Sequence, residues 1–456
     1  MREAKRTYLD SELYKEILPL IKDVLPVRYL RPQNYSEICE ALDNGDGNTV
    51  RFLKIDYTPF RLKQKLRKLK KFRHRIQANK KLDPIIRKIY KEKVEESVLG
   101  VRLMMAYGNK SFTAISKRFF GFPKKSDINH CWKILEKNRL DRLKDSYLLP
   151  NNINKFLRQE RNLFNKARRG RKAEEMFASI KSLMDKNKKV SAMGIYQFFE
   201  KELMVGKNQP LIFHKALRVL FDNMAYVAAQ RSDPESIVKA LREFLSRMDF
   251  ENWQVDLVAG LPVKISVRAN ERKILINKEA EFYRQEMPAL LAHEIIHLLK
   301  AYNGRLQPLK MLRKMAFYQC FEEGIAEFVA RKKLPKDIST ERFITPELRV
   351  VAVSLAIKHR TQEVYDILRS FGISKDLARS TTVRVKQGNK DGHGCFTKDH
   401  IYYSGLCQVR DWLAGFSEEE QLEMINRTMI GKIKISDLEM IEKFEGIEPK
   451  FVITNF

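Results

Sequence analysis

The sequence predicts an α+β protein that is predominantly helical. Over most of the chain, apolar residues recur every three to four positions, which is the periodicity of amphipathic helices. Between 252 and 277 the pattern changes to short runs rich in Val and Ile, separated by turn residues, and these runs predict three strands: 254–258, 262–268 and 272–277. Helical patterns then dominate from 284 onward, except near 381–396. A chain of 456 residues with 44% hydrophobic content can build a packed core in two or three domains.

The part of the chain before these strands is predicted to consist of helices. Apolar stripes with helical spacing predict helices over 10–25, 61–75, 83–107 and 112–120, and helical patterns resume over 173–249. In the segment 61–75, leucines repeat on one face and the outer face carries lysine and arginine. That segment is therefore expected to be an amphipathic helix with a cationic outer face.

Breaks in the pattern suggest three parts of the chain. The basic segment 166–172 (KARRGRK) contains a glycine and is typical of a linker or an exposed corner. We therefore expect a basic helical N-terminal region over 1–170, a helical connecting region over 171–250 and a further domain over 251–456.

The charge balance is strongly positive. There are 87 lysines and arginines against 57 acidic residues, a formal net charge of +30. Such a surface attracts polyanions and acidic protein surfaces. No zinc-finger, RRM or KH signature accompanies it, so nucleic-acid binding, if present, would be non-specific and salt-dependent.

Cysteine usage and hydropathy predict a cytoplasmic protein with no membrane partner. The five cysteines are scattered without a CxxC pair, which argues against a disulfide framework or a cysteine-based zinc site. No signal peptide and no apolar run of about 18 residues are visible. The sequence does not indicate the oligomeric state.

The strongest chemical signal is the pattern HEIIH over His293–His297. Pro288 suits the first turn of a helix there, and Gly304 suits its end. On a helix, positions i and i+4 share a face, so His293 and His297 can bind one metal ion, with Zn²⁺ as the expected cofactor. Glu294 is then placed to accept a proton from the attacking water.

A zinc hydrolase needs a third protein ligand, and acidic residues follow at a suitable distance. The helical segment 321–328 contains Glu322, Glu323 and Glu327. Its acid-Gly-apolar-Ala pattern resembles the third-ligand helix of gluzincin metallopeptidases, in which the glutamate directly before glycine binds zinc, and this selects Glu323. Glu327 lies one turn later and is a candidate to support a ligating histidine. The alternative for these acids is a solvated face.

The predicted strands also fit a zincin-like catalytic domain. In zincins an edge strand lies above the metal helix and holds an extended peptide by backbone pairing. Either 264–268 or 273–277 would serve, and the sequence does not choose between them. The alternative is an ordinary small sheet.

Three blocks together resemble the tyrosine carboxypeptidase family, which includes the microtubule-associated tyrosine carboxypeptidases and bacterial QEGLA-motif proteins. The blocks are LLAHEIIHLLKAYNGRLQP over 290–308, EEGIA over 322–326 and VRVKQGNKDGHGCFTKDHIYYSGL over 383–406. Weaker similarity reaches back to 30–34 and 86–123. The resemblance implies a gluzincin-type zinc metallocarboxypeptidase that removes a C-terminal tyrosine or similar aromatic residue.

By position, the resemblance assigns His293 and His297 as metal ligands, Glu323 as the third ligand and Glu294 as the catalytic acid. Tyr402 matches a family tyrosine that is a candidate to stabilise the oxyanion. The family typically has the pattern HExxxH, whereas this chain has HExxH. A regular helix aligns i with i+4 and turns i+5 away, so this chain needs no local bulge, but its pocket shape and substrate choice are expected to differ.

A carboxypeptidase also needs a cation for the terminal carboxylate of its substrate. The candidates in the resembling blocks are Arg305, Arg384, Lys386 and Lys398. Arg384 and Lys386 would share a face if 383–387 were a strand. With 87 cations in the chain, any single lysine is more often a solvated surface group.

The remaining polar residues of these blocks have supporting or structural interpretations. Asp399, like Glu322 and Glu327, is a candidate to position its neighbours. Tyr403 takes a position that is apolar in the family and is expected to pack. Histidines beside glycine and charge, such as His393 and His400, are usually surface groups.

The hypothesis is a zinc carboxypeptidase whose substrate is a peptide or protein C-terminus, including an acidic tail. Two alternatives stay open. One is an endopeptidase or aminopeptidase of the same zinc class, in which Glu322 could hold the substrate amine. The other is a basic nucleic-acid-binding or scaffold protein with a vestigial zinc site.

Overall fold

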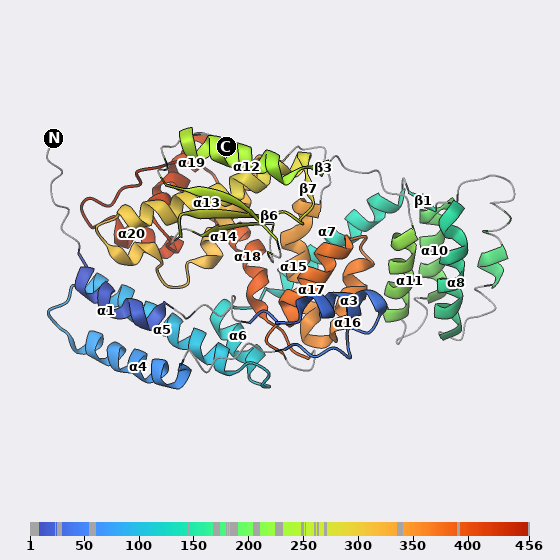
Figure 1. Ribbon diagram of the computed structural model, residues 1–456, viewed down its shortest axis with the longest axis horizontal. Coiled ribbons are helices and arrows are strands. Elements are labelled where there is room, and N and C mark those ends of the chain that lie inside the picture. Colours follow the sequence, from blue (N-terminus) through green and yellow to red (C-terminus); the bar gives the residue numbers. More distant parts are fainter. Residues whose placement is uncertain are drawn as a thin grey trace.

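The computed structural model describes most of the chain. The described residues are 9–22, 24, 30–53, 61–144, 146–148, 150–166, 174–178, 180, 182, 190–203, 210–223, 231–247, 250, 252–259, 261, 264–268, 271–334, 341–389 and 393–454. Apart from Lys166, the basic segment 166–172 lies outside them. The described part is predominantly helical with a small mixed sheet, which confirms the predicted α+β class (Figure 1).

The helices before the sheet include those predicted within 10–25, 61–75, 83–107, 112–120 and 173–249, and three more over 35–44, 125–144 and 150–166 that the sequence analysis did not predict. They are α1 (Ser11–Ile21), α3 (Tyr35–Asn44), α4 (Leu62–Ala78), α5 (Pro84–Met105), α6 (Phe112–Phe120), α7 (Lys125–Lys144), α8 (Pro150–Lys166), α10 (Ala192–Leu203), α11 (Pro210–Asn223) and α12 (Pro234–Arg247). Helix α5 begins at Pro84 because the carboxylate of Asp83 accepts hydrogen bonds from the backbone N–H groups of Ile85 and Ile86, at 2.8 and 3.1 Å.

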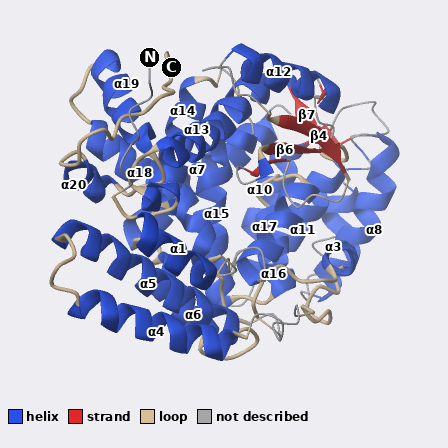
Figure 2. Cartoon of the chain, turned by 60° about the vertical axis from the view of Figure 1, so that its left-hand side comes forward, coloured by secondary structure: helices blue, strands red, loops and turns tan. Residues whose placement is uncertain are grey.

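The sheet contains the three predicted strands. Strand β6 (Lys273–Asn277) lies in the centre, parallel to β4 (Gln254–Val258) and antiparallel to β5 (Ile265–Arg268). Helix α12 packs on this sheet (Figure 2), and β5, at one edge, contacts helix α13 (Met287–Leu306). Of the two strands considered as a peptide-binding edge, 273–277 is therefore central, and 264–268 contains the edge strand β5.

Two short antiparallel pairs accompany this sheet. They join β1 (Tyr147–Leu148) to β2 (Val190–Ser191), and β3 (Arg231–Ser232) to β7 (Phe282–Tyr283). The second pair holds the chain just before α13, so it anchors the start of that helix.

The helices after the sheet complete the fold. They are α13, α14 (Gln319–Lys332), α15 (Glu341–Lys358), α16 (Thr361–Arg369), α17 (Lys375–Lys386), α18 (Ile401–Leu413), α19 (Glu418–Arg427) and α20 (Leu438–Ile441). Short 3₁₀ turns lie between them, including η4 (Lys310–Arg313), η5 (Thr397–His400) and η6 (Thr428–Ile430). None of the described helices is long and apolar enough to cross a membrane.

The two ends of the chain share one hydrophobic core. Apolar side chains of α1, α4 and α5 pack with those of η4 and of the segment 430–447. Buried Asp10 ties this region together, since its carboxylate accepts hydrogen bonds from Tyr90 Oη at 2.7 Å and from the backbone N–H groups of Lys310 and Met311 at 2.6 and 3.0 Å. The parts 1–170 and 251–456 thus pack against each other, and the proposed three-part division stays a prediction.

Two local predictions are wrong. The segment 383–387 is not a strand, because α17 continues through Lys386. Gly304 does not end α13, which runs on to Leu306. Gly304 instead allows close approach, since a Cβ there would lie 2.7 Å from the carbonyl oxygen of Leu312.

Candidate metal centre

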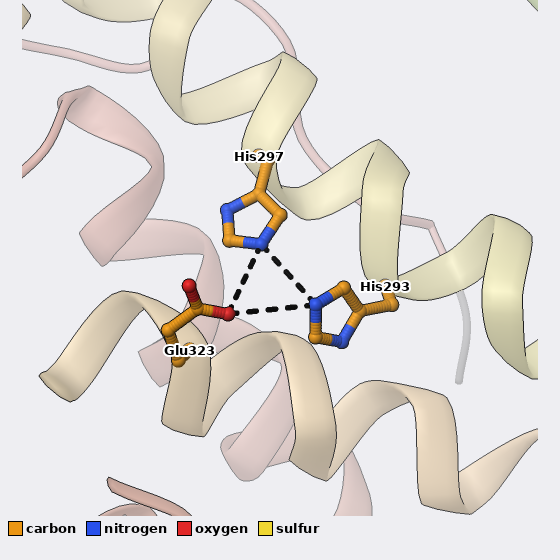
Figure 3. A group of neighbouring side chains, drawn as sticks. All are labelled: His293, His297 and Glu323. Atoms are coloured by element: carbon orange, nitrogen blue, oxygen red, sulfur yellow. Dashed lines mark hydrogen bonds and ion pairs between the residues drawn. The ribbon is translucent and has the colours of Figure 1, made fainter. Parts of the chain in front are cut away.

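Three ligand atoms from two adjacent helices face one point. His293 and His297 project from the same face of α13, and their Nε2 atoms lie 3.3 Å apart. Glu323 projects from α14, and its Oε2 atom lies 3.5 Å from each of these nitrogens (Figure 3). The helix between the histidines is regular, as expected for the HExxH spacing.

These separations fit a bound zinc ion. Tetrahedral coordination at metal–ligand distances of about 2.0–2.1 Å places neighbouring ligand atoms about 3.3–3.4 Å apart. The observed separations are 3.3 to 3.5 Å. Glu323 Oε2 is buried and makes no hydrogen bond within the described part of the chain, so its lone pairs face the other two ligand atoms. Two imidazoles and one carboxylate form a donor set that suits zinc.

Acidic residues orient both imidazoles. His297 Nδ1 lies 2.8 Å from Glu322 Oε1, and His293 Nδ1 lies 3.4 Å from Glu327 Oε1. With the protons on Nδ1, both Nε2 lone pairs face the centre, as in carboxylate–histidine–metal arrangements. Lys432 Nζ also donates to Glu322 Oε1, at 2.8 Å, and so balances that buried carboxylate. The two glutamates thus occupy the supporting positions that the sequence suggested.

The charges within this group shift its protonation equilibria. Burial disfavours ionised Glu322, but Lys432 and His297 outweigh burial and lower the pKa of Glu322 to about 2. Burial likewise opposes ionisation of Glu323, but His297 and His293 hold its pKa well below the ordinary value. Both carboxylates are therefore ionised at neutral pH, which a cation site requires.

A close helix crossing places Glu323. Helix α14 packs against α18, and a Cβ added at Gly324 would clash with the backbone of Gly405. Only residues without a side chain allow such a close approach. The crossing brings the first turn of α18 to the first turn of α14, where the Sγ atom of Cys320 lies 3.7 Å from the carbonyl oxygen of Ile401.

A group of cations lies beside the triad. Arg349, Arg384 and Lys398 surround the buried carboxylate of Asp399, and we call these three the cation cluster. Burial opposes ionisation of Asp399, but Arg384, Arg349 and Lys398 outweigh it and lower its pKa. Lys398 also contributes to the lowered pKa of Glu323, so the cation cluster adjoins the ligand group.

The aromatic ring of Tyr402 connects members of the cation cluster. The guanidinium carbon of Arg349 lies 3.9 Å from the ring centroid, and Lys398 Nζ lies 5.2 Å from it. Arg384 forms two hydrogen bonds to Asp399, at 2.6 and 2.8 Å. The structure thus brings four predicted residues together here, namely Arg384, Lys398, Asp399 and Tyr402.

Two predicted substrate-binding residues lie elsewhere. Arg305 is in the last turn of α13, where Arg313 and Arg272 are among its charged neighbours. Lys386 is fully buried and donates to the backbone carbonyls of Ala356, His359 and Gly394, so it stabilises the end of α15.

The structure also shows the burial of Glu294, Tyr403 and two histidines that the sequence analysis considered. Glu294 is half-buried on the same turn of α13 as His293. His393 is exposed and Tyr403 is packed in a core, as expected. His400 is not a surface group. It is buried, with Nδ1 2.9 Å from Ser404 Oγ and Nε2 3.0 Å from the carbonyl oxygen of Phe120.

Sequence reasoning missed two residues of the site. Lys432 reaches Glu322 from a segment 110 positions away, and Arg349 reaches Tyr402 from the middle of α15. Neither belongs to a recognisable motif. Their local sequences read as ordinary basic positions, so no signal in the sequence singles them out.

The fold and the site define a class of protein: a predominantly helical α+β protein with a candidate metal-binding group on two adjacent helices. A family model described as microtubule-associated tyrosine carboxypeptidase matches residues 197–451, more than half of the chain. The chain therefore belongs to the microtubule-associated tyrosine carboxypeptidase family, and membership indicates a carboxypeptidase that acts on peptides or proteins. No curated protein matches the chain significantly.

The family match confirms the resemblance inferred from the three sequence blocks. It includes α13, α14 and α18, which carry the site. It begins within α10, so it does not cover the weaker similarity noted at 30–34 and 86–123.

Proposed function

We propose that the chain is a zinc-dependent carboxypeptidase of gluzincin type that removes a C-terminal tyrosine or other aromatic residue. The observation that carries this proposal is the triad of His293, His297 and Glu323, whose ligand atoms have the spacing of a tetrahedral zinc site. The triad lies within the segment that matches the carboxypeptidase family.

The chemistry follows from the groups around the triad. Zinc, when bound, would lower the pKa of a water molecule and polarise the scissile carbonyl. Glu294 accepts the proton of the attacking water and returns it to the leaving amine. Tyr402 or Lys398 donates a hydrogen bond to the developing oxyanion. Glu322 and Glu327 hold the two imidazoles in the tautomer that this arrangement needs.

Substrate recognition is assigned to the cation cluster and to strand β5. An exopeptidase must bind a free terminal carboxylate, and the cation cluster supplies positive charge next to the ligand group. Strand β5 lies at an edge of the sheet against α13, where an extended peptide could pair with it. The family description points to microtubule proteins, so we propose a protein with an acidic C-terminal tail as the substrate.

The decisive experiment uses peptides that vary at the C-terminal residue, read by mass spectrometry after incubation with the zinc-loaded protein. We expect removal of a single terminal residue, with tyrosine and other aromatics preferred. Companion peptides blocked at either end separate the alternatives. Cleavage of C-terminally amidated peptides at internal bonds would indicate an endopeptidase, and dependence on a free amine would indicate an aminopeptidase.

A single substitution tests the mechanism. Glu294→Gln removes the proton acceptor while preserving the shape of the side chain, so we expect hydrolysis to fall by about 10²–10⁴-fold. Zinc content measured by atomic absorption should stay at the wild-type level, since Glu294 is not among the proposed ligands. Hydrolysis by this variant at the wild-type rate would show that the proposed role of Glu294 is wrong. Absence of hydrolysis by the wild-type protein as well would favour the alternative of a scaffold protein with a vestigial zinc site.

We also propose a cytoplasmic location, for which the five unpaired cysteines are the support. Fractionation of cells that express the chain tests this proposal. We expect the protein in the cytosolic fraction, and its recovery in the membrane pellet would contradict the proposal.

A further inference from the structure

The proposed carboxypeptidase activity places a geometric demand on the site. The terminal carboxylate of a substrate lies one residue beyond the scissile carbonyl, and one extended residue spans about 3.3–3.6 Å. The group that binds this carboxylate must therefore lie next to the ligand triad. It must also have hydrogen-bond donors that the fold has not already used.

Most of the cations suggested by the sequence do not meet this demand. Arg384 already forms two hydrogen bonds to Asp399. Lys386 is buried among backbone carbonyls, and Arg305 lies two turns beyond His297 on α13. Lys398 is buried against the triad, where its charge acts on Glu323. The position of Lys398 therefore suits a contact with the scissile carbonyl better than a contact with the terminal carboxylate of the substrate.

Arg349 has an unused donor, and Tyr402 and Lys398 connect it to the ligand triad. Its guanidinium is stacked over the ring of Tyr402 at 3.9 Å, and that ring also lies 5.2 Å from Lys398 Nζ. Stacking fixes the plane of the guanidinium and leaves its edge free to form two parallel hydrogen bonds. Nη1 of Arg349 is buried and has no hydrogen-bond partner among the described residues. A buried donor without a partner is destabilising, and an incoming carboxylate would relieve this.

The charge balance of the cation cluster supports the same assignment. Three cations share the single carboxylate of Asp399. Arg384 takes up that carboxylate in a bidentate pair, so the charges of Arg349 and Lys398 are not neutralised within the cluster. A second carboxylate would complete the balance, and a peptide C-terminus provides one.

We propose that Arg349 binds the terminal carboxylate of the substrate through a bidentate pair, with the ring of Tyr402 holding its guanidinium in place. This inference rests on the proposed function. Arg349 would then set the preference for a free C-terminus, while Arg384 and Asp399 would act as its structural support.

The test measures binding rather than turnover. In a zinc-loaded Glu294→Gln background, isothermal titration compares two short acidic peptides that end in tyrosine, one as the free acid and one as the amide. We expect the free acid to bind more tightly. Adding Arg349→Gln should weaken binding of the free acid by about tenfold or more, since a charge-assisted bidentate pair is lost. Binding of the amide should stay the same.

Two further variants make the result specific. Arg349→Lys keeps the charge but loses the bidentate geometry, so it should retain part of the preference for the free acid. Lys358→Gln removes an exposed cation from the end of the same helix, and should leave both affinities unchanged. Zinc content and melting temperature are measured for each variant.

The outcomes separate the inference from the function on which it rests. If the Glu294→Gln protein with Arg349 intact shows no preference for the free acid, the proposed carboxypeptidase function fails. If that preference exists and is undiminished in the Arg349→Gln variant, the assignment of Arg349 is wrong. Equal loss of acid and amide binding, or loss of zinc from the Arg349 variants, would show a structural role and would also overturn the assignment.

Discussion

Glu322 shows how one side chain can shape the candidate metal site. Its Oε1 atom contacts His297 Nδ1 and Lys432 Nζ, each at 2.8 Å. A buried carboxylate is costly unless it is paired, and here the pairing also favours one tautomer of a proposed metal ligand. Lys432 would thus act on a bound metal ion through two other side chains.

The first prediction at this scale concerns Lys432. Lys432→Met should weaken zinc affinity by about 10–100-fold, because Glu322 loses its counter-ion and then holds His297 less firmly. Competition with a chromophoric chelator measures the affinity. Lys434→Met is the matched control, since Lys434 lies two residues from Lys432 but pairs with Glu92 of α5. Equal zinc affinity in the Lys432 variant and wild type would contradict the assignment.

The second prediction concerns Glu160 on α8, a carboxyl group that the mechanism does not use. Its side chain is fully buried, and within the described part of the chain both of its oxygens lack hydrogen-bond partners. Burial raises the pKa of Glu160 well above its ordinary value of 4.5. Between pH 4.5 and the raised pKa, the folded state keeps a proton that the unfolded state has lost, so stability falls as pH rises.

Glu160→Gln should remove this penalty. Melting temperatures measured from pH 4 to pH 8 should show little difference from wild type at pH 4 and a more stable variant at pH 8. A variant that is equally or less stable than wild type across the whole range would show that Glu160 has a partner in solution.

At the level of elements, the crossing of α14 and α18 is the most demanding contact around the site. Gly324 and Gly405 meet backbone to backbone, and Glu323 is the direct neighbour of Gly324. Any side chain at the crossing forces the two helices apart and shifts the third ligand relative to α13.

Gly324→Ala should therefore reduce the free energy of unfolding by about 1–3 kcal/mol, measured by urea denaturation, and should lower zinc content. Gly194→Ala is the control. Gly194 is an exposed residue of α10, and a Cβ there would come no closer than 4.0 Å to the nearest side-chain atom, Ser191 Cβ. Alanine there should therefore be neutral or stabilise by about 0.5–1 kcal/mol. Wild-type stability of the Gly324 variant would show that the helices can separate at little cost.

The segment 383–387 shows why some elements could not be predicted. Two valines alternate with charged residues there, which is a strand-like pattern. The structure instead extends α17, which is capped at its N-terminus by Ser374, whose hydroxyl accepts a hydrogen bond from the N–H group of Leu377. Val383 and Val385 are both buried because this helix is covered on more than one side. When a helix is buried on several faces, its apolar residues no longer repeat every three to four positions, so the sequence pattern does not indicate a helix.

The candidate site was predictable to the extent that its chemistry is local. The HExxH pattern lies within one helix, so spacing on a helix was enough to select its two histidines. Glu323 follows within a short distance, and the resemblance of its segment to the third-ligand helix of gluzincins selected it. Lys432 and Arg349 depend on tertiary packing between segments far apart in the chain. Periodicity carries no information about such contacts.

At the scale of the whole molecule, the net charge of +30 shapes how substrates approach. Much of the charge lies away from the triad, as on α4, which is separated from α13 and α14 in the fold (Figure 1). The outer face of α4 is lined with exposed lysine and arginine. Long-range attraction between this surface and an acidic peptide is screened by salt, because the Debye length is about 10 Å at 0.1 M.

We therefore expect KM for a peptide with an acidic tail to rise several-fold between 50 and 300 mM salt, an order-of-magnitude estimate from charge screening. Zinc content should not change over this range, because the ligands are largely buried. A peptide with a neutral tail and the same terminal residue is the control. If KM is independent of salt for both peptides, the charge of the molecule has no part in substrate binding.

The shared core of the two chain ends has a consequence for synthesis on the ribosome. Helices α1, α4 and α5 are synthesised long before residues 430–447, yet their apolar faces pack with those residues. Lys432 belongs to that late segment and supplies the counter-ion of Glu322. A nascent chain can therefore carry the HExxH helix well before the surroundings of the candidate metal site are complete.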